Sequence, residues 1–168
     1  MAHRLRPVGP EFTGAAPVRL VFGREVSAAP DRVFRALAED VTGWTEWFGP
    51  VTLSRPLDGG AGREIRLRGG ARVRETVLLT RAPEVYAYRV DVTNVPGARA
   101  LAEEWRLTPA GTGTRVRWTM AADGTAPFRL ALAAARPGLG LTFRGAVTSL
   151  DRRLAGRLPA GPDAGPQQ

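Results

Sequence analysis

Apolar and polar residues alternate along most of the chain in short segments, and glycine- and proline-rich turns separate these segments. Alternation of this kind is typical of β-strands with one buried face. Strands are predicted at residues 18–27, 51–55, 63–68, 72–81, 85–93, 101–108 and 114–121. Short turns such as Gly69-Gly70 and Pro96-Gly97 join them, as an antiparallel meander requires. The pattern therefore predicts a curved antiparallel sheet of about seven strands.

Two short helices are predicted after the first strand. Pro30 at a helix start, followed by an acidic first turn, favours a helix that ends at Ala38. Gly43 then separates this helix from a short aromatic turn with Trp44 and Trp47.

Near the C-terminus the spacing of apolar residues changes from that of strands to that of helices. Residues 126–135 form a short helical run, and Arg136-Pro137-Gly138 is expected to break it. From Leu139 to Leu154 the apolar positions recur every three or four residues, which predicts a long helix with one face on the sheet. The fold class is therefore α+β, with the sheet wrapped around the C-terminal helix.

The organisation is that of one domain. Residues 17–156 are expected to form it, because this length can bury a substantial core without disulfides or metals. Residues 1–16 mix proline, glycine and small residues and are interpreted as a flexible arm. Residues 157–168 are rich in helix-breaking residues and are interpreted as a disordered tail.

Composition excludes several kinds of chemistry. The chain has no cysteine and one histidine, His3. A thiol nucleophile, a cysteine-ligated metal and a histidine-rich metal site are therefore excluded, and we expect no metal and no cofactor. Phosphate-binding loops and the nucleophile-elbow motif are also absent from the sequence.

The net charge of +8 comes from 24 basic side chains, all of them arginine. They are scattered rather than clustered, so we expect no specific nucleic acid partner and attribute the excess to composition. No segment approaches the ~20 apolar residues of a membrane span, and no signal peptide is recognisable. The simplest expectation is a cytoplasmic protein, either a monomer or a homodimer.

Strand alternation places two carboxylates, Glu75 and Glu103, on faces that are otherwise apolar. An ionised carboxylate is costly to bury without a partner, so each must be paired, protonated or near a cavity mouth. One hypothesis is that Glu75 or Glu103 acts as a general base, while Tyr86 or Tyr88 and an inward-reaching arginine polarise a ketone oxygen. The alternative is a structural role, with an arginine such as Arg68 or Arg144 or a tyrosine hydroxyl as partner.

The same alternation suggests which side chains contact a ligand. A cavity between sheet and helix would be walled by apolar and aromatic groups, which suit a small hydrophobic molecule. The candidate ligand-binding residues are Trp105, Trp118, Tyr88, Met120, Val77, Phe143 and Val147. Core packing explains the aromatic residues nearly as well.

Several segments together resemble the START-like (SRPBCC) superfamily in its polyketide cyclase/dehydrase branch. These segments are residues 24–37, the Trp44/Trp47 turn, residues 75–77 leading to Ala82-Pro83 and Tyr86, and residues 104–109 with 113–118. The resemblance covers about residues 18–156. The Hsp90-activator-like domains have a similar front end and remain an alternative.

The resemblance implies a helix-grip (Bet v 1/START-like) fold with a deep cavity between the sheet and the last helix. It further implies that a polyketide, lipid or aromatic molecule binds there. In some relatives the cavity directs aldol cyclisation or dehydration of a poly-β-ketone chain. Three hypotheses follow: a cyclase-like enzyme, a non-catalytic carrier or sensor of an apolar ligand, and a protein- or RNA-interaction module.

Overall fold

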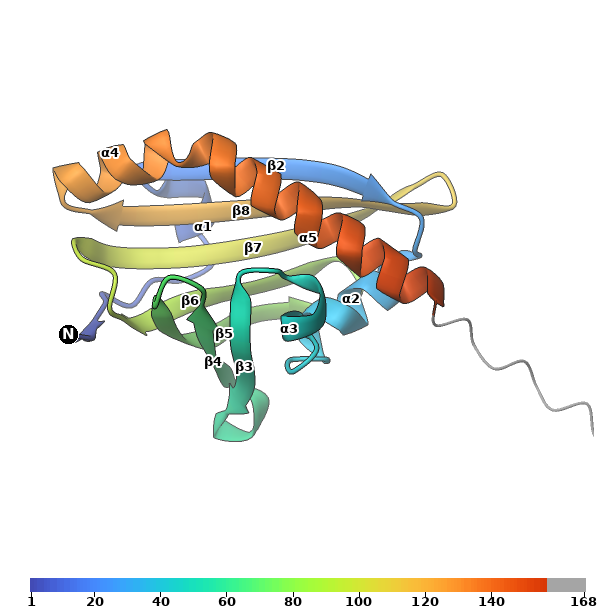
Figure 1. Cartoon of the computed structure of the whole chain (residues 1–168), viewed down its shortest axis with the longest axis horizontal. Coiled ribbons are helices and arrows are strands. Elements are labelled where there is room, and N and C mark those ends of the chain that lie inside the picture. Colours follow the sequence, from blue (N-terminus) through green and yellow to red (C-terminus); the bar gives the residue numbers. More distant parts are fainter. Residues whose placement is uncertain (157–168) are drawn as a thin grey trace, which may run out of the picture.

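The predicted strands form one antiparallel sheet in the computed structural model, which describes residues 1–156 (Figure 1). The strands are β1 (His3–Arg4), β2 (Val18–Val26), β3 (Val51–Leu57), β4 (Gly62–Leu67), β5 (Arg72–Arg81), β6 (Val85–Thr93), β7 (Ala98–Ala110) and β8 (Gly113–Gly124). The helices are α1 (Phe12–Ala15), α2 (Pro30–Ala38), α3 (Trp44–Trp47), α4 (Ala126–Ala134) and α5 (Arg136–Gly156), with a 3-10 turn at Asp58–Gly60. The tail predicted at residues 157–168 lies outside the described residues.

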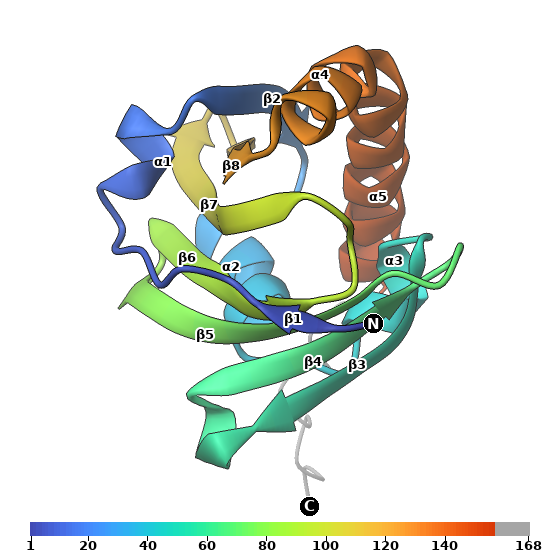
Figure 2. The ribbon, with the colours of Figure 1, turned by 90° about the vertical axis from the view of Figure 1, so that its left-hand side faces the viewer.

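The sheet order is β2-β8-β7-β6-β5-β4-β3, with β1 paired to β6. Consecutive strands are neighbours except that β2 crosses over to pair with β8. Figure 2 shows that this order curves into an open half-barrel, and that α5 closes its open side. The helix-grip fold and its short helices α2 and α3 are confirmed.

Strands β6 and β7 pair over only part of their length. Their register runs from Val85 opposite Arg106 to Arg89 opposite Ala102, and no β6–β7 pairing continues beyond it in the described chain. From there β7 stays paired with β8 as far as Ala98, while β6 remains paired with β5. The two halves of the sheet therefore diverge at this point, which leaves space between sheet and helix.

The N-terminal segment differs from the flexible arm that we expected. His3 and Arg4 pair with the edge of β6 that β7 leaves free. Leu5 is buried against Val90 and Ala98. The proline and glycine residues of this segment suggested flexibility. The burial of the apolar Leu5 side chain instead holds the segment against the sheet.

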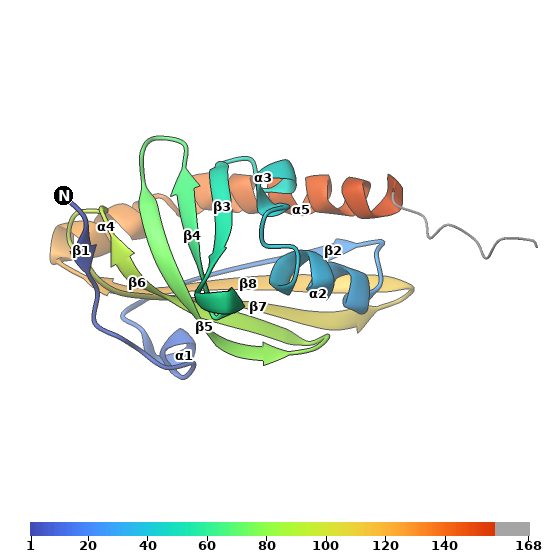
Figure 3. The ribbon, with the colours of Figure 1, turned by 90° about the horizontal axis from the view of Figure 1, so that it is seen from below.

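The segment continues over the outer face of the sheet. Val8 and Phe12 cover Ala100 and Ala102, two small outward residues of β7. Seen from below, α1 lies on the other side of the sheet from α4 and α5 (Figure 3). The outer face of β7 is therefore buried, which explains small apolar side chains at outward positions.

The two C-terminal helices follow each other with only Ala135 between them. Ala135 has helical torsion angles, and its carbonyl accepts a hydrogen bond from Leu139 N over 3.0 Å. The expected break at residues 136–138 is instead the first turn of α5. Pro137 is compatible with this position because the first turn of a helix needs no intrahelical N–H bonds.

Helix α5 packs closely on the sheet through its second turn. A Cβ atom on Gly140 would lie 3.2 Å from the ring of Phe22, so glycine permits the approach of helix and strand. Phe143 then stacks on Trp118, with ring centroids 6.0 Å apart. Trp118 in turn stacks on Trp105 at 5.5 Å, and these rings form the centre of the core.

Candidate functional site

A cavity of about 250 Å³ occupies the space where β6 and β7 diverge, between the sheet and helices α3 to α5. Most of its wall is apolar. The apolar lining consists of Trp44, Phe48, Pro50, Val51, Ile65, Leu67, Ala71, Val73, Val90, Val95, Ala98, Leu101, Trp118, Met120, Phe128 and Leu139. Such a wall favours a ligand with little exposed polarity.

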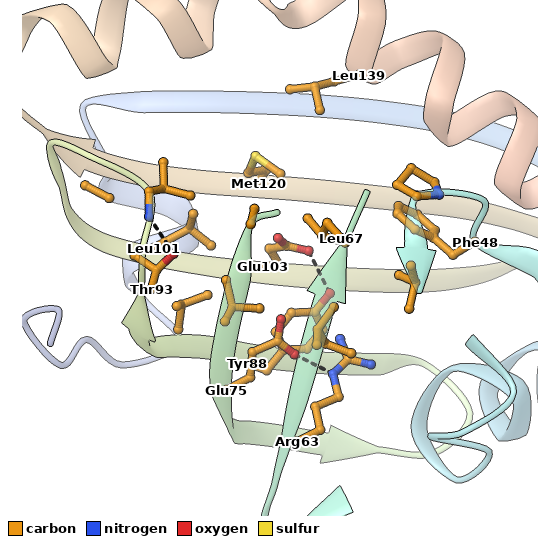
Figure 4. A pocket seen from close by; sticks show the side chains of 18 of the residues that line it. Phe48, Arg63, Leu67, Glu75, Tyr88, Thr93, Leu101, Glu103, Met120 and Leu139 are labelled. Atoms are coloured by element: carbon orange, nitrogen blue, oxygen red, sulfur yellow. Dashed lines mark hydrogen bonds and ion pairs between the residues drawn. The ribbon is translucent and has the colours of Figure 1, made fainter. Parts of the chain in front are cut away.

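Four polar side chains form a row across one wall of the cavity, which we call the polar row: Arg63, Glu75, Tyr88 and Glu103. They come from the adjacent strands β4, β5, β6 and β7. Strand register explains the row, because Arg63 lies opposite Glu75 and Tyr88 lies opposite Glu103. Directly opposite residues of antiparallel strands share a face and contact each other. Figure 4 shows the four side chains together beneath Met120 and Leu139.

Arg63 and Glu75 form a buried ion pair. Arg63 Nε donates to Glu75 Oε2, and both side chains are almost inaccessible to solvent. The Arg63 guanidinium carbon also lies 4.0 Å from the Trp44 ring centroid and 4.2 Å from that of Tyr88. A cation between two aromatic faces is stabilised by their quadrupoles, so Arg63 is held in place on three sides.

The ion pair does not use all of the Arg63 donors. Nη1 is buried and has no hydrogen-bond partner within residues 1–156. Buried donors in native proteins are nearly always paired, so this unpaired N–H of a residue that lines the cavity is a feature to be explained.

Glu103 is held by two donors on one of its oxygens. Tyr88 Oη donates to Glu103 Oε2 over 2.6 Å, and Trp118 Nε1 donates to the same oxygen over 2.9 Å. Trp105 Nε1 donates to Tyr88 Oη over 3.1 Å, which fixes the tyrosine in turn. Within the described residues these contacts leave Oε1 without a hydrogen bond, while the half-buried Glu103 lines the cavity.

The environment of Glu103 shifts its protonation into the physiological range. Burial and, to a smaller extent, the negative charge of Glu75 raise the pKa of Glu103 to about 7, against the hydrogen bonds from Tyr88 and Trp118. Burial also raises the pKa of Tyr88 well above its ordinary value. Near neutral pH, Glu103 therefore exists in both protonation states while Tyr88 stays neutral.

Glu75 differs from Glu103 because a cation faces it. Burial raises the pKa of Glu75 and the Arg63 charge opposes that rise. Although burial alone would lower the pKa of Arg63, the Glu75 charge holds it above its ordinary value, so the guanidinium stays protonated. The polar row thus contains one permanent cation, its counterion, and one carboxyl group that titrates near neutrality.

The structure places five of the ten predicted site residues on the cavity wall: Glu75, Glu103, Tyr88, Trp118 and Met120. The other five lie behind it: Tyr86, Trp105, Val77, Phe143 and Val147. Trp105 and Phe143 are covered by their stacking on Trp118, and Tyr86 lies behind Tyr88 with its ring 5.4 Å away. Val77 adjoins a register shift in β5, which strict alternation does not anticipate.

Sequence reasoning missed Arg63, the partner of Glu75, and considered Arg68 and Arg144 instead. The signal was available in the hairpin. A turn at Gly69-Gly70 makes β4 and β5 neighbours, and counting outward from it brings Arg63 opposite Glu75. The packing of Leu5 against Val90 and Ala98, two residues of the cavity wall, had no comparable signal.

Residues 17–155 match the family model described as polyketide cyclase / dehydrase and lipid transport. The chain belongs to this family. Its curated relatives include an uncharacterized protein of Mycobacterium tuberculosis and one of Mycobacterium bovis. Each is 31% identical over 158 residues, which cover 91% of this chain and 94% of the relative.

Solved structures with the same fold include the protein XoxI from Bacillus cereus, with a TM-score of 0.67 and 13% identity. The alignment covers 82% of this chain and 96% of XoxI. A START superfamily protein from Mycobacterium smegmatis has a TM-score of 0.63 at 10% identity, with coverage of 82% and 97%. At these identities the likeness shows the fold alone. Membership of the family supports a role in binding hydrophobic ligands.

Proposed function

We propose that the cavity binds a small, mainly apolar molecule that carries a ketone, and that the polar row promotes an intramolecular aldol or dehydration step on it. One observation carries this proposal. An apolar cavity contains a single row of polar groups, in which a permanent cation lies near a carboxyl group whose pKa is about 7.

Glu103 is suited to act as the general base. A base works best when its pKa is close to the working pH, because it is then partly ionised and still basic. The two hydrogen bonds to Oε2 orient the carboxylate, so that Oε1 is the oxygen available to a bound molecule. Glu103 would remove a proton from the carbon next to a ketone.

Arg63 is suited to stabilise the oxygen on which negative charge develops. Arg63 lines the cavity, and its fixed positive charge favours an enolate or alkoxide oxygen near it. Glu75 acts through Arg63, because the ion pair and the two aromatic faces keep the guanidinium in position. Glu75 is therefore proposed as a positioning residue rather than as a base.

The proton balance of the step closes within the site. Glu103 takes the proton, the enolate carbon attacks a second ketone of the same molecule, and the resulting alkoxide takes a proton back from Glu103. Loss of water then gives a conjugated ring ketone. A cavity that folds the chain supplies the proximity, which alone lowers such barriers by several kcal/mol.

The direct test uses a linear diketone whose carbonyl carbons are separated by three methylene groups, since ring closure yields a conjugated cyclohexenone with a new ultraviolet absorbance. We expect the protein to accelerate its appearance, and Glu103→Gln to reduce the rate roughly 10²–10⁴-fold. The matched control is Glu104→Gln, because Glu104 neighbours Glu103 on β7 and pairs on the outer face with Arg106. Equal rates in Glu103→Gln and the parent would refute Glu103 as the base.

The second candidate function is that of a non-catalytic carrier or sensor. It is favoured by the internal pairing of the polar row, since Glu75 and Glu103 are both hydrogen-bonded without a ligand. Saturable binding of apolar molecules with no acceleration of the diketone reaction would support this function instead.

A further inference from the structure

Helix α4 is the least buried apolar element of the described chain. None of its nine residues is buried, although its sequence is Ala-Pro-Phe-Arg-Leu-Ala-Leu-Ala-Ala. Leu130 is 74% exposed, and Leu141 on the second turn of α5 is 68% exposed. Exposed apolar patches that are bordered by polar residues mark interaction sites on many proteins.

The two exposed leucines lie on either side of the α4–α5 junction. Leu130 belongs to α4 and Leu141 to the second turn of α5. Val21 of β2 lies beside Leu141 around a shallow depression of the surface, and it is 36% exposed. We call Val21, Leu130 and Leu141, together with the arginines described next, the α4 ridge.

The charged residues of the α4 ridge are all positive. Arg129, Arg136 and Arg144 flank the leucines, and all three are exposed. Among residues 1–156 none of the three forms an ion pair with a carboxylate, whereas most arginines on the sheet do. The sequence contains no acidic residue between Asp123 and Asp151. An apolar ridge bordered by unpaired cations is complementary to an anionic surface with an apolar interior.

We propose that the α4 ridge binds the surface of membranes that contain anionic lipids. No helix of the described chain is long and apolar enough to cross a bilayer, so this is attachment to the surface. A second copy of the chain would fit poorly, because it would bring the same three arginines against each other. Separate exposed leucines bordered by arginines also suit insertion among lipid headgroups better than they suit a shaped protein pocket.

The position of the α4 ridge relates this attachment to the cavity. Phe128 of α4 and Leu139 and Thr142 of α5 line the cavity from the helical side. In Figure 1, α4 and the start of α5 lie beside the arrowhead end of β8 and the start of β7. Attachment to a membrane would therefore hold the helical side of the cavity against the lipid bilayer, which is a reservoir of apolar molecules.

The test is co-sedimentation of the full chain with vesicles of phosphatidylcholine alone or mixed with phosphatidylglycerol, at near-physiological salt. We expect binding to the mixed vesicles only. Arg129→Gln/Arg136→Gln/Arg144→Gln should weaken it at least about ten-fold, because each arginine near the surface contributes separately. Leu130→Gln/Leu141→Gln should weaken it as well, since the apolar contact is lost.

The matched control is Arg24→Gln/Arg74→Gln/Arg99→Gln, which removes the same charge from exposed arginines elsewhere on the sheet. It should retain most of the binding. An equal loss in this control would show that only the net charge matters and would overturn the proposal. Absence of vesicle binding, or concentration-dependent self-association abolished by Leu130→Gln/Leu141→Gln, would also overturn it. None of these outcomes bears on ligand binding in the cavity, which is measured without lipid.

Discussion

Tyr88 and Glu103 lie opposite each other on β6 and β7, and the tyrosine hydroxyl donates to the carboxylate over 2.6 Å. This contact occurs close to the end of the β6–β7 register, next to the point where the two strands diverge. The strand pair therefore ends in a hydrogen bond that also orients the titrating group of the cavity.

Removing that hydroxyl tests the relationship. Tyr88→Phe should raise the pKa of Glu103 further, because it deletes a donor that stabilises the ionised form. It should also destabilise the fold by about 1–3 kcal/mol, since Trp105 Nε1 loses its buried acceptor. The Glu103 carboxyl resonance in an NMR pH titration measures the first effect. Tyr86→Phe is the control, because the Tyr86 hydroxyl does not contact Glu103, and an equal shift there would contradict the assignment.

The pH dependence of stability follows from Glu103 as well. Its pKa is about 7 in the folded protein and near 4.5 in the unfolded chain. Between these values the folded state binds more protons, so the stabilisation is complete below pH ~4.5 and is lost as pH rises through about 7. The total is at most roughly 3 kcal/mol.

Glu103→Gln should remove this dependence. Relative to the parent, the variant should gain stability as pH rises from about 5 to 8, measured by denaturant unfolding at several pH values. Catalysis by ionised Glu103 would rise over the same pH range, so activity and stability should change in opposite directions. A parent and variant whose stability difference is independent of pH would contradict the raised pKa.

The Arg63–Glu75 pair predicts strong non-additivity. Arg63→Met or Glu75→Met alone should cost about 3–5 kcal/mol, because each leaves an unpaired charge in the core. The double variant should recover much of this loss, since two apolar side chains replace the pair. Additive losses in a double-mutant cycle of unfolding free energies would show that the two groups do not act as a pair.

Alternation predicted most of the architecture, because the sheet has one apolar face whose period is unambiguous. It also placed Glu75 and Glu103 correctly on the inner face. Alternation could not distinguish residues of the cavity wall from residues of the hydrophobic core. Trp118 and Trp105 share a face of the sheet, and only their stacking in three dimensions shows which of them covers the other. Cross-strand register, which made Arg63 the partner of Glu75, requires hairpin geometry in addition to period.

The N-terminal segment carries a further prediction. Deleting residues 2–8 should lower stability by at least about 1.5 kcal/mol, because Leu5 no longer covers Val90 and Ala98 and the edge of β6 loses its partner. Thermal unfolding measures this. Since Val90 and Ala98 line the cavity, the deletion should also weaken ligand binding. An unchanged melting temperature would support the flexible arm that the sequence suggested.

We expect the cavity beside the polar row to hold an apolar molecule. The most direct test is titration with the neutral fluorescent probe N-phenyl-1-naphthylamine, compared between the parent, Met120→Trp and Arg117→Trp. Met120 lines the cavity, whereas Arg117 is an exposed residue of the same strand β8.

We expect saturable one-to-one binding at low micromolar or weaker affinity in the parent and in Arg117→Trp. Met120→Trp should lose at least about ten-fold in affinity, because the larger side chain occupies the ligand's space. Absence of saturable binding in the parent, or equal binding in all three proteins, would contradict a cavity that holds an apolar molecule.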